Sequence, residues 1–342
     1  MGLLSIDPRI PLYTIEVTIL ISGAAGFIGS ALASRLQNMG HKLLLIDRYS
    51  DFYSIDMKRS RVSSQLPHQK IEELDLADKS SIEKMDLSKV ETIVHLAAQP
   101  GVRVGLVQSN NYLTDNIAAF SNLLFVARKY NIKKFVYASS SSVYGASSML
   151  PFSEDEELQL PTVSYPRTKY INEKLAELYS NSDTTQILGL RFFSVYGPWG
   201  RPDMAPLRLL SSALNGHKFK LLGGTANQRD FTYIDDVVDS IIKLLNLETV
   251  TPPIINVGGG NYRSIAELIN IIEKLTGQEI DIRDTSADLR DVPTTWASFE
   301  LLEKSINSHP SIDLENGIAK TLDWILKNKL QKKLEFWCNT SI

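Results

Sequence analysis

Tyr165 and Lys169 stand four residues apart, with Pro166 directly after the tyrosine. Proline is tolerated only in the first turn of a helix, so a helix is predicted to begin near Tyr165 and to run to about Asn181. Residues four apart share one helix face, and a cation beside a phenol favours the phenolate and lowers its pKa. We therefore expect Tyr165 to act as a general base at neutral pH, with Lys169 as the group that lowers its pKa.

Four consecutive hydroxyl side chains, Ser139 to Ser142, follow the apolar strand pattern Lys134–Ala138. Serine is common in turns and helix caps, so this run alone favours a structural role. At the carboxyl end of a parallel strand, however, the same hydroxyls would lie where open α/β sheets bind ligands. A ligand-binding role for the serine run is favoured because the run precedes the Tyr165–Lys169 pair and follows an N-terminal glycine motif.

That motif consists of Gly23, Gly26 and Gly29, between the apolar run Val17–Ile21 and a helical pattern over Phe27–Asn38. Strand, glycine turn and helix are the context of a dinucleotide site. One glycine permits the tight turn, another lets the backbone approach a pyrophosphate, and the third allows close packing of helix on strand. The free N–H groups at the helix start then attract phosphate.

Asp47 ends the next apolar run, Lys42–Ile46, about 20 residues beyond the glycines, which fits an acceptor for a ribose 2′-hydroxyl. Its charge would repel a 2′-phosphate, so the sequence favours NAD over NADP. Arg48 leaves the alternative open, because an arginine there can tolerate the extra phosphate.

Composition excludes several classes of protein. The 342 residues include 36 Lys and Arg and 39 Asp and Glu, a net charge of −3 that gives no basic field for nucleic acid or an anionic membrane. The one cysteine, Cys338, excludes an intramolecular disulfide and a cysteine metal cluster, and no metal is expected. No apolar run reaches the roughly 18 residues of a membrane span, and the first residues lack a signal-peptide layout. We expect a cytoplasmic enzyme.

Strand patterns alternate with amphipathic stretches through the first half of the chain, the longest being Ser109–Tyr130. This alternation predicts a Rossmann-like, doubly wound parallel sheet. The expected strands are Val17–Ile21, Lys42–Ile46, Lys70–Leu74, Thr92–Leu96, Lys134–Ala138 and Gln186–Leu190.

After about Leu190 the pattern becomes irregular and rich in Gly and Pro. We expect residues 1–190 to form an NAD-binding domain, with 1–16 as an N-terminal extension. Residues 191–330 are expected to form a smaller C-terminal α/β substrate lobe interleaved with the sheet. Residues 331–342 would be a tail that packs on the body or on a partner.

With these motifs in view, the chain resembles the extended short-chain dehydrogenase/reductases that act on nucleotide sugars, and within them the UDP-glucuronate 4-epimerases. The most specific shared block is Tyr196–Ala205. Further similar stretches are His95–Gln99, Gly101–Arg103, Tyr137–Gly145, Arg191–Ser194, Arg229–Asp236 and Asp291–Pro293.

The resemblance implies a catalytic set of Ser140, Tyr165 and Lys169, with NAD as cofactor and a UDP-sugar as substrate. Tyr165 would remove the proton of the sugar 4-hydroxyl while NAD takes the hydride of carbon 4. Ser140 would bond the same oxygen, and Lys169 would bind the nicotinamide ribose. The 4-keto sugar would then turn and recover the hydride on its other face. Relatives pair through their long helices, so a homodimer is expected.

The resemblance also implies two sets of binding residues. The cofactor set is Gly23, Gly26, Phe27, Ile28, Gly29, Asp47, Asp75, Leu76, Ala97, Asn116, Tyr165 and Lys169. The substrate set is Arg103, Ser140, Ser141, Ser142, Ser194, Arg201, Arg229 and Asp291. Within it, the hydroxyls of Ser141, Ser142 and Ser194, with Arg201 as a charged partner, are candidates to hold a sugar carboxylate.

Four other functions stay open. UDP-galactose 4-epimerases carry asparagine where Ser194 stands and glucuronate epimerases usually threonine, so this hydroxyl favours a uronate. UDP-glucuronate decarboxylases typically have a glutamate where Ser142 lies, and 4,6-dehydratases need an acid pair at Ser141 and Ser142. A non-enzymatic sensor of NAD or of a sugar nucleotide is disfavoured by the intact catalytic set.

Overall fold

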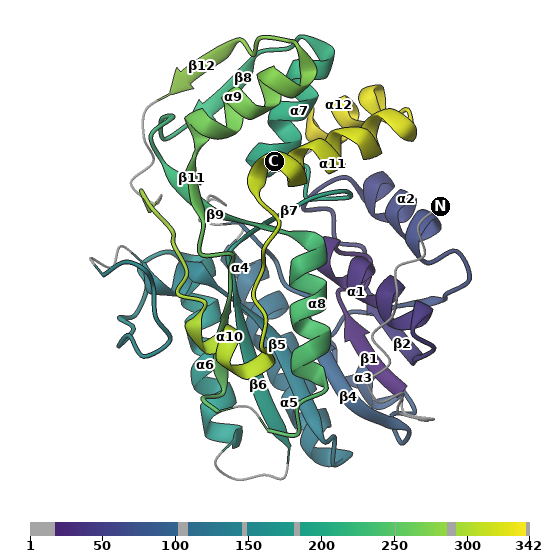
Figure 1. Cartoon of the computed structure of the whole chain (residues 1–342). Coiled ribbons are helices and arrows are strands. Elements are labelled where there is room, and N and C mark those ends of the chain that lie inside the picture. The colour runs from purple at the N-terminus through teal and green to yellow at the C-terminus, as the bar shows by residue number, and fades with distance from the viewer. Residues whose placement is uncertain are drawn as a thin grey trace.

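A computed structural model describes residues 18–101, 109–145, 149–180, 185–249, 251–285 and 292–339 (Figure 1). Its centre is a seven-stranded sheet of order β10-β6-β5-β4-β1-β2-β3. All six strand pairs are parallel, which confirms the predicted doubly wound sheet. The strands are β1 (Thr18–Ser22), β2 (Lys42–Asp47), β3 (Ile71–Glu73), β4 (Val90–His95), β5 (Lys134–Ser140), β6 (Gln186–Phe192) and β10 (Ile254–Val257).

Helices cover both faces of this sheet. Successive strand residues point to opposite sides, and apolar residues on both sides are buried against these helices. Ile19 and Ile21 of β1 join one buried cluster, while Leu20 between them joins the other. The first cluster includes residues of α1 (Phe27–Asn38) and α8 (Ile234–Leu245), and the second includes residues of α5 (Ala119–Lys129) and α6 (Ser164–Ser180). Burial on both faces explains why the strands read as continuous apolar runs.

The expected single helix over Ser109–Tyr130 is interrupted. It consists of α4 (Ser109–Tyr112), a π-helical segment η2 (Leu113–Ala118) and α5. Within η2 the Asn116 side chain accepts a hydrogen bond from the Gln99 N–H at 2.7 Å and donates to the Gln99 carbonyl at 3.1 Å. Such π segments are frequent at functional sites, and apolar periodicity does not reveal them.

The C-terminal half lies mainly beyond the carboxyl ends of the sheet strands (Figure 1). It holds a three-stranded sheet and a two-stranded one, with α8 and β10 returning to the main sheet. The elements are β7 (Ser194–Tyr196), α7 (Ala205–Asn215), β8 (Phe219–Leu222), β9 (Gln228–Tyr233), β11 (Tyr262–Ser264), α9 (Ile265–Thr276), β12 (Ile282–Thr285), α10 (Glu300–Ile306) and α11 (Leu314–Lys327). The domain boundary at residue 190 stays a prediction, and β6 runs across it.

The tail forms α12 (Gln331–Asn339), which contacts α7. Trp337 is fully buried, whereas its neighbour Phe336 is 55% exposed. The Trp337 indole N–H donates to Asp56 Oδ2 at 2.9 Å, in α2 (Ile55–Gln65). The tail therefore packs on the body of its own chain. Within the described ranges, no helix is long and apolar enough to cross a membrane.

Candidate active site

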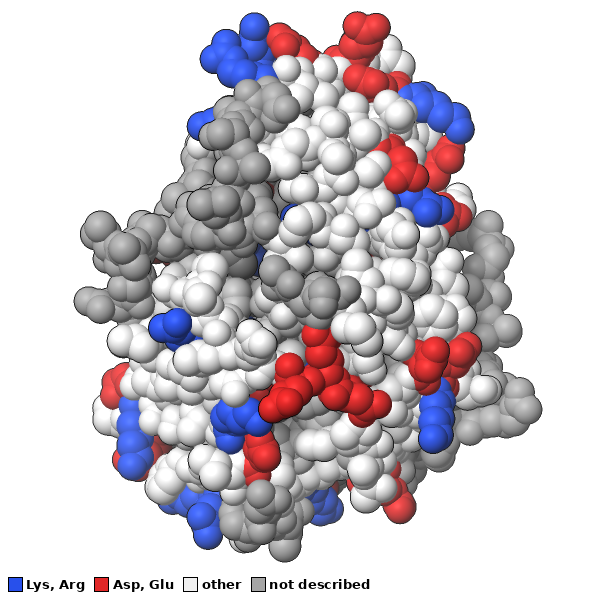
Figure 2. Space-filling view, turned by 90° about the vertical axis from the view of Figure 1, so that its left-hand side faces the viewer, with Lys and Arg blue, Asp and Glu red and all other residues white. Residues whose placement is uncertain are grey.

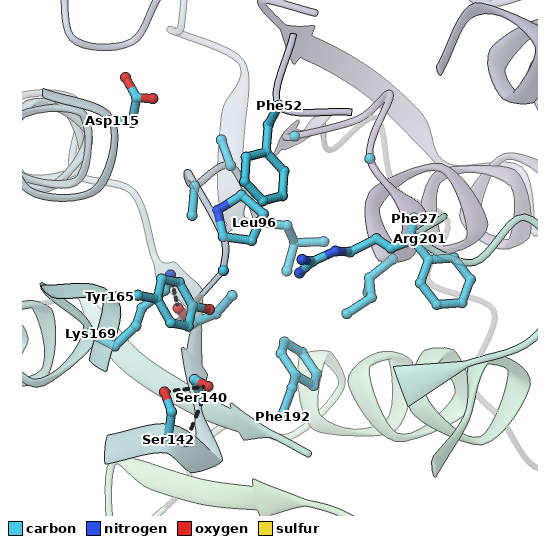
Figure 3. Close-up of a pocket in the computed structure, with 18 of the residues that line it drawn as sticks. Phe27, Phe52, Leu96, Asp115, Ser140, Ser142, Tyr165, Lys169, Phe192 and Arg201 are labelled. Carbon is cyan, nitrogen blue, oxygen red and sulfur yellow. Dashed lines mark hydrogen bonds between the residues drawn. The ribbon is translucent and has the colours of Figure 1, made fainter. Parts of the chain in front are cut away.

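A cavity of about 550 Å³ lies at the carboxyl edge of the sheet (Figure 3). Its walls come from the glycine turn after β1, the ends of β2 and β5, the start of α6, and the segment after β6. Seventeen of the predicted site residues line it: Gly23, Gly26, Phe27, Ile28, Gly29, Asp47, Asp75, Leu76, Ala97, Ser140, Ser141, Ser142, Tyr165, Lys169, Ser194, Arg201 and Arg229. The topology thus gathers motifs that are far apart in the sequence.

The glycine turn is shaped by close backbone approach. Gly23 has a φ of +75°, and a Cβ there would lie 2.7 Å from the Ala97 nitrogen. A Cβ on Gly29 would lie only 2.1 Å from the Gly23 carbonyl oxygen. Gly26 is the N-cap of α1 and offers no side-chain cap, so the first N–H groups of the helix suit an anion.

Asp47 is fixed at the end of β2 by two backbone donors. Its Oδ2 accepts from the Ala25 N–H at 3.0 Å, and its Oδ1 accepts from the Tyr49 N–H at 2.7 Å. The carboxylate is therefore held beside the glycine turn and borders the cavity. This position fits the predicted acceptor for a ribose hydroxyl.

Arg48, next to it, is already occupied by two carboxylates. Its guanidinium donates to Asp75 Oδ2 at 3.1 Å and to Asp115 Oδ2 at 2.6 Å. Burial raises the pKa of Asp115, and the charge of Arg48 counteracts that rise. The arrangement disfavours the alternative in which Arg48 receives a 2′-phosphate.

Ser140 and Lys169 make specific contacts near the phenol. Ser140 Oγ accepts from the Ser142 hydroxyl at 2.9 Å and from the Ser142 N–H at 3.2 Å. Lys169 Nζ donates to the Ala138 carbonyl at 2.7 Å and lies 6.0 Å from the centre of the Tyr165 ring. The Ser140 hydroxyl is near enough to Tyr165 to lower the pKa of its phenol. Figure 3 shows these three residues on one side of the cavity.

The electrostatics of Tyr165 differ from the sequence-based expectation. Burial raises its pKa, while the charge of Arg201 and the neighbouring Ser140 hydroxyl lower it in part. Burial also lowers the pKa of Lys169 to about 8, with Glu173 acting in the opposite sense. The contribution of Lys169 to lowering the tyrosine pKa stays a prediction. Desolvation dominates, and Arg201 is the favourable charge.

Arg201 reaches into the cavity from the side opposite Tyr165 (Figure 3). Its guanidinium is paired with Asp203, and the Nε–Oδ1 distance is 3.0 Å. The sequence predicted Arg201 in the pocket but not Asp203 as its partner. The Asp203 carboxylate is the charge partner of the largely buried Arg201 side chain.

The last four predicted residues, Arg229, Asn116, Arg103 and Asp291, fall into three groups. Arg229 Nη1 donates to the Gln228 and Pro293 carbonyls at 2.7 and 3.1 Å, at the edge of the cavity. Asn116 is fully buried outside the lining, and its side chain also donates to Thr168 Oγ1 at 3.0 Å. Arg103 and Asp291 lie outside the described residues.

Sequence reasoning missed a buried polar network behind Lys169. Glu173, one turn further along α6, receives hydrogen bonds from Arg191 Nε and Nη2 at 3.0 and 2.8 Å. Ser139 donates to the same carboxylate, and Arg191 Nη1 donates to the Tyr144 hydroxyl at 2.8 Å. The repeat of polar residues every four positions from Tyr165 was the available signal.

Sequence reasoning also missed Arg61 of α2, whose side chain is fully buried. It donates to the Ala25 carbonyl in the glycine turn at 2.7 Å and to the Trp199 carbonyl at 2.8 and 3.1 Å. In the sequence it is one of three basic residues on a polar helix, and nothing marks it as buried.

The family described as the NAD dependent epimerase/dehydratase family matches residues 19–258. Protein CapI of Staphylococcus aureus is 36% identical over 90% of this chain and 98% of its own length. A probable UDP-glucuronate 4-epimerase of Rhizobium meliloti is 33% identical, over 90% of this chain and 97% of its own length.

Solved structures share the fold. The Bacillus cereus UDP-glucuronic acid 4-epimerase in complex with UDP-glucuronic acid and NAD has a TM-score of 0.82 at 31% identity, covering 91% of this chain and 100% of the other. MoeE5 in complex with UDP-glucuronic acid and NAD has a TM-score of 0.79 at 30% identity, covering 91% and 99%.

Proposed function

Because the chain belongs to the NAD dependent epimerase/dehydratase family, we propose that it interconverts UDP-glucuronate and UDP-galacturonate by NAD-dependent epimerisation at carbon 4. The observation that carries this proposal is the single cavity that contains the glycine turn, Asp47 and the set Ser140, Tyr165 and Lys169. A dinucleotide and a sugar hydroxyl can both reach such a site.

The residues present fit NAD. Side chains at Gly23 and Gly29 would fill the turn that the pyrophosphate approaches, and Asp47 is oriented for a ribose hydroxyl. Bound there, NAD supplies a reversible hydride acceptor. Phe27, Ile28, Asp75, Leu76 and Ala97 complete its side of the cavity. Asn116 supports this wall from behind, through the backbone of Gln99.

Tyr165 is the general base in this proposal. Its phenolate takes the proton of the sugar 4-hydroxyl, and the phenol formed returns that proton after the sugar has turned. Ser140 bonds the same oxygen from its place on the same side of the cavity as Tyr165. Lys169 is anchored on the Ala138 carbonyl and offers its remaining N–H groups to the nicotinamide ribose.

The sugar carboxylate needs firm support, because a 4-keto uronate is a β-keto acid that can lose carbon dioxide. Ser141, Ser142 and Ser194 line the cavity together with Arg201. These groups would hold the carboxylate away from the orientation that breaks the carbon–carbon bond. Arg229 is proposed to bind the diphosphate, and Arg103 and Asp291 are proposed to bind the substrate.

The decisive experiment is incubation of the purified protein with UDP-glucuronate and NAD, followed by mass spectrometry and NMR. An unchanged mass with new galacturonate signals supports the proposal. Loss of carbon dioxide identifies a decarboxylase, and loss of water a dehydratase. Turnover of UDP-glucose but not of UDP-glucuronate identifies an epimerase for neutral sugars.

We further propose that the enzyme is a cytoplasmic homodimer. Apolar side chains are exposed on two helices that contact each other, Phe125 on α5 and Leu178 on α6. The side of the molecule on which α6 and α10 lie shows broad uncharged areas with charges of both signs among them (Figure 2). Light scattering of the wild type and of Leu178→Glu tests this, since only the variant should have the mass of a monomer.

A further inference from the structure

Among the residues that the structure describes, no carboxylate is paired with the buried guanidinium of Arg61. Its side chain has 0% exposure, and it is bonded only to neutral oxygens in the described part of the chain: the Ala25 and Trp199 carbonyls and the Tyr53 hydroxyl at 2.9 Å. Buried charges in proteins are normally paired. An anion bound at the glycine turn would add a negative charge near Arg61, because Ala25 belongs to that turn.

At its other end Arg61 holds a residue in an unfavourable conformation. Trp199 has a φ of +62°, in the left-handed region that bulky residues rarely adopt. Its carbonyl accepts two hydrogen bonds from Arg61, and its ring packs against Trp324 and Trp337 at centroid distances of 5.0 and 5.8 Å. Strained residues that are held by several neighbours tend to occur at ligand sites.

The position of the Trp199 backbone sets the position of the Arg201 backbone. Arg201 follows two residues later, lines the cavity, and its charge acts on Tyr165. One guanidinium group therefore touches both the turn that borders the dinucleotide site and the segment that carries a side chain of the sugar site. The hydrogen bonds of Arg61 therefore link two segments that are far apart in the sequence.

We propose that Arg61 is a positioning residue that couples the dinucleotide site to the nucleotide-sugar site. An anion bound at the glycine turn stabilises the guanidinium where it is, and the guanidinium in turn stabilises the Trp199–Arg201 segment. By linkage, each ligand then raises the affinity for the other by the same factor. This inference rests on the proposed function, because the two ligands are NAD and a UDP-sugar.

The test measures coupling in a Tyr165→Phe background, which prevents turnover. Calorimetry gives the Kd of UDP-glucuronate for NAD-depleted and NAD-saturated protein. We expect NAD to tighten this Kd about tenfold, within the usual range of allosteric coupling. Arg61→Met should bring the ratio to about 1. Arg61→Lys should lower it while keeping more NAD affinity, because an ammonium group keeps the charge but lacks the planar fork.

Arg59→Met is the matched control, because Arg59 lies on the same helix with a side chain that is 62% exposed. It should leave the coupling ratio unchanged. A folded Arg61→Met protein with an unchanged ratio overturns the inference. If neither Arg61 variant folds, hydrogen exchange of the unsubstituted protein decides: NAD alone must slow exchange over residues 199–204, and no slowing overturns the inference.

Failure of this inference is distinguishable from failure of the proposed function. A wild-type protein that epimerises UDP-glucuronate, together with an Arg61→Met variant that keeps its coupling, refutes only the role of Arg61. A wild-type protein that binds neither NAD nor UDP-glucuronate refutes the proposed function.

Discussion

Glu173 lies one helical turn beyond Lys169 on α6 and receives two hydrogen bonds from Arg191 of β6. Both side chains of this ion pair are less than a tenth exposed. The pair therefore fastens the helix that carries Tyr165 and Lys169 to the sheet. It also places a negative charge near Lys169, which raises the pKa of that lysine against the effect of burial.

Glu173→Gln should lower the free energy of unfolding by about 3–5 kcal/mol, because Arg191 would remain buried without its partner. Urea denaturation measures this loss. Glu177→Gln removes only the surface pair with Lys174 and should cost less than about 1 kcal/mol. Equal costs for the two variants would show that the buried pair does not fasten α6.

Tyr165→Phe should retain bound NAD and reduce turnover by about 10²–10⁴-fold, the usual contribution of a general acid–base group. NMR follows the formation of galacturonate, and chromatography of denatured protein quantifies the bound NAD. Tyr170→Phe, on the same helix, is the control and should leave turnover unchanged. Near-normal turnover in the Tyr165 variant would mean that another group is the base.

Turnover should rise with pH above neutrality, because burial raises the pKa of Tyr165 and the phenolate is the active form. Arg201 counteracts that rise, so Arg201→Met should raise the tyrosine pKa further. The rising limb of kcat against pH, measured at saturating UDP-glucuronate, should then move to higher pH. An unmoved limb would show that the Arg201 charge does not act on the base.

Asp47→Ala should weaken NAD binding about 10- to 100-fold, because a hydrogen bond to a charged group contributes about 1.5–3 kcal/mol. The same change removes the repulsion of a 2′-phosphate, so the preference for NAD over NADP should narrow. Titrations with both dinucleotides measure this. Asp51→Ala, on the same segment, is the control. An unchanged ratio of affinities would remove Asp47 from the selection of the cofactor.

Trp337→Ala should lower the free energy of unfolding by about 3–5 kcal/mol, as is usual for a buried aromatic residue replaced by alanine. Phe336→Ala changes the neighbouring, exposed ring and should stay within about 0.5 kcal/mol of the wild type. Chemical denaturation of both variants compares them. Similar stabilities would mean that α12 contributes little to the fold.

The sequence predicted the sheet and most of the cavity, because both depend on local signals. Apolar runs marked six of the strands in the main sheet, and the seventh, β10, comes from the half in which the pattern is irregular. Motifs directly after strands then had to meet at one edge. The π-helical turn at Leu113–Ala118 left no such signal, because apolar spacing changes little over one turn.

The polar contacts behind the site could not be predicted from the sequence, for a different reason. Glu173, Arg191 and Arg61 belong to residue types that usually lie on the surface, and only the tertiary fold shows that they are buried. The effect of burial on Tyr165 was missed in the same way. Spacing suggested a neighbouring charge, but the degree of desolvation depends on segments distant in sequence.

The pairing of β10 with β6 has a consequence for how the chain can be divided. Strand β6 is an interior strand only because residues 254–257 return to cover it. A fragment that stopped before residue 254 would leave a long apolar strand with open backbone donors and acceptors, which is a template for self-association. The nucleotide-binding half therefore depends on the second half to stay in solution, and the two halves cannot be recombined as independent modules.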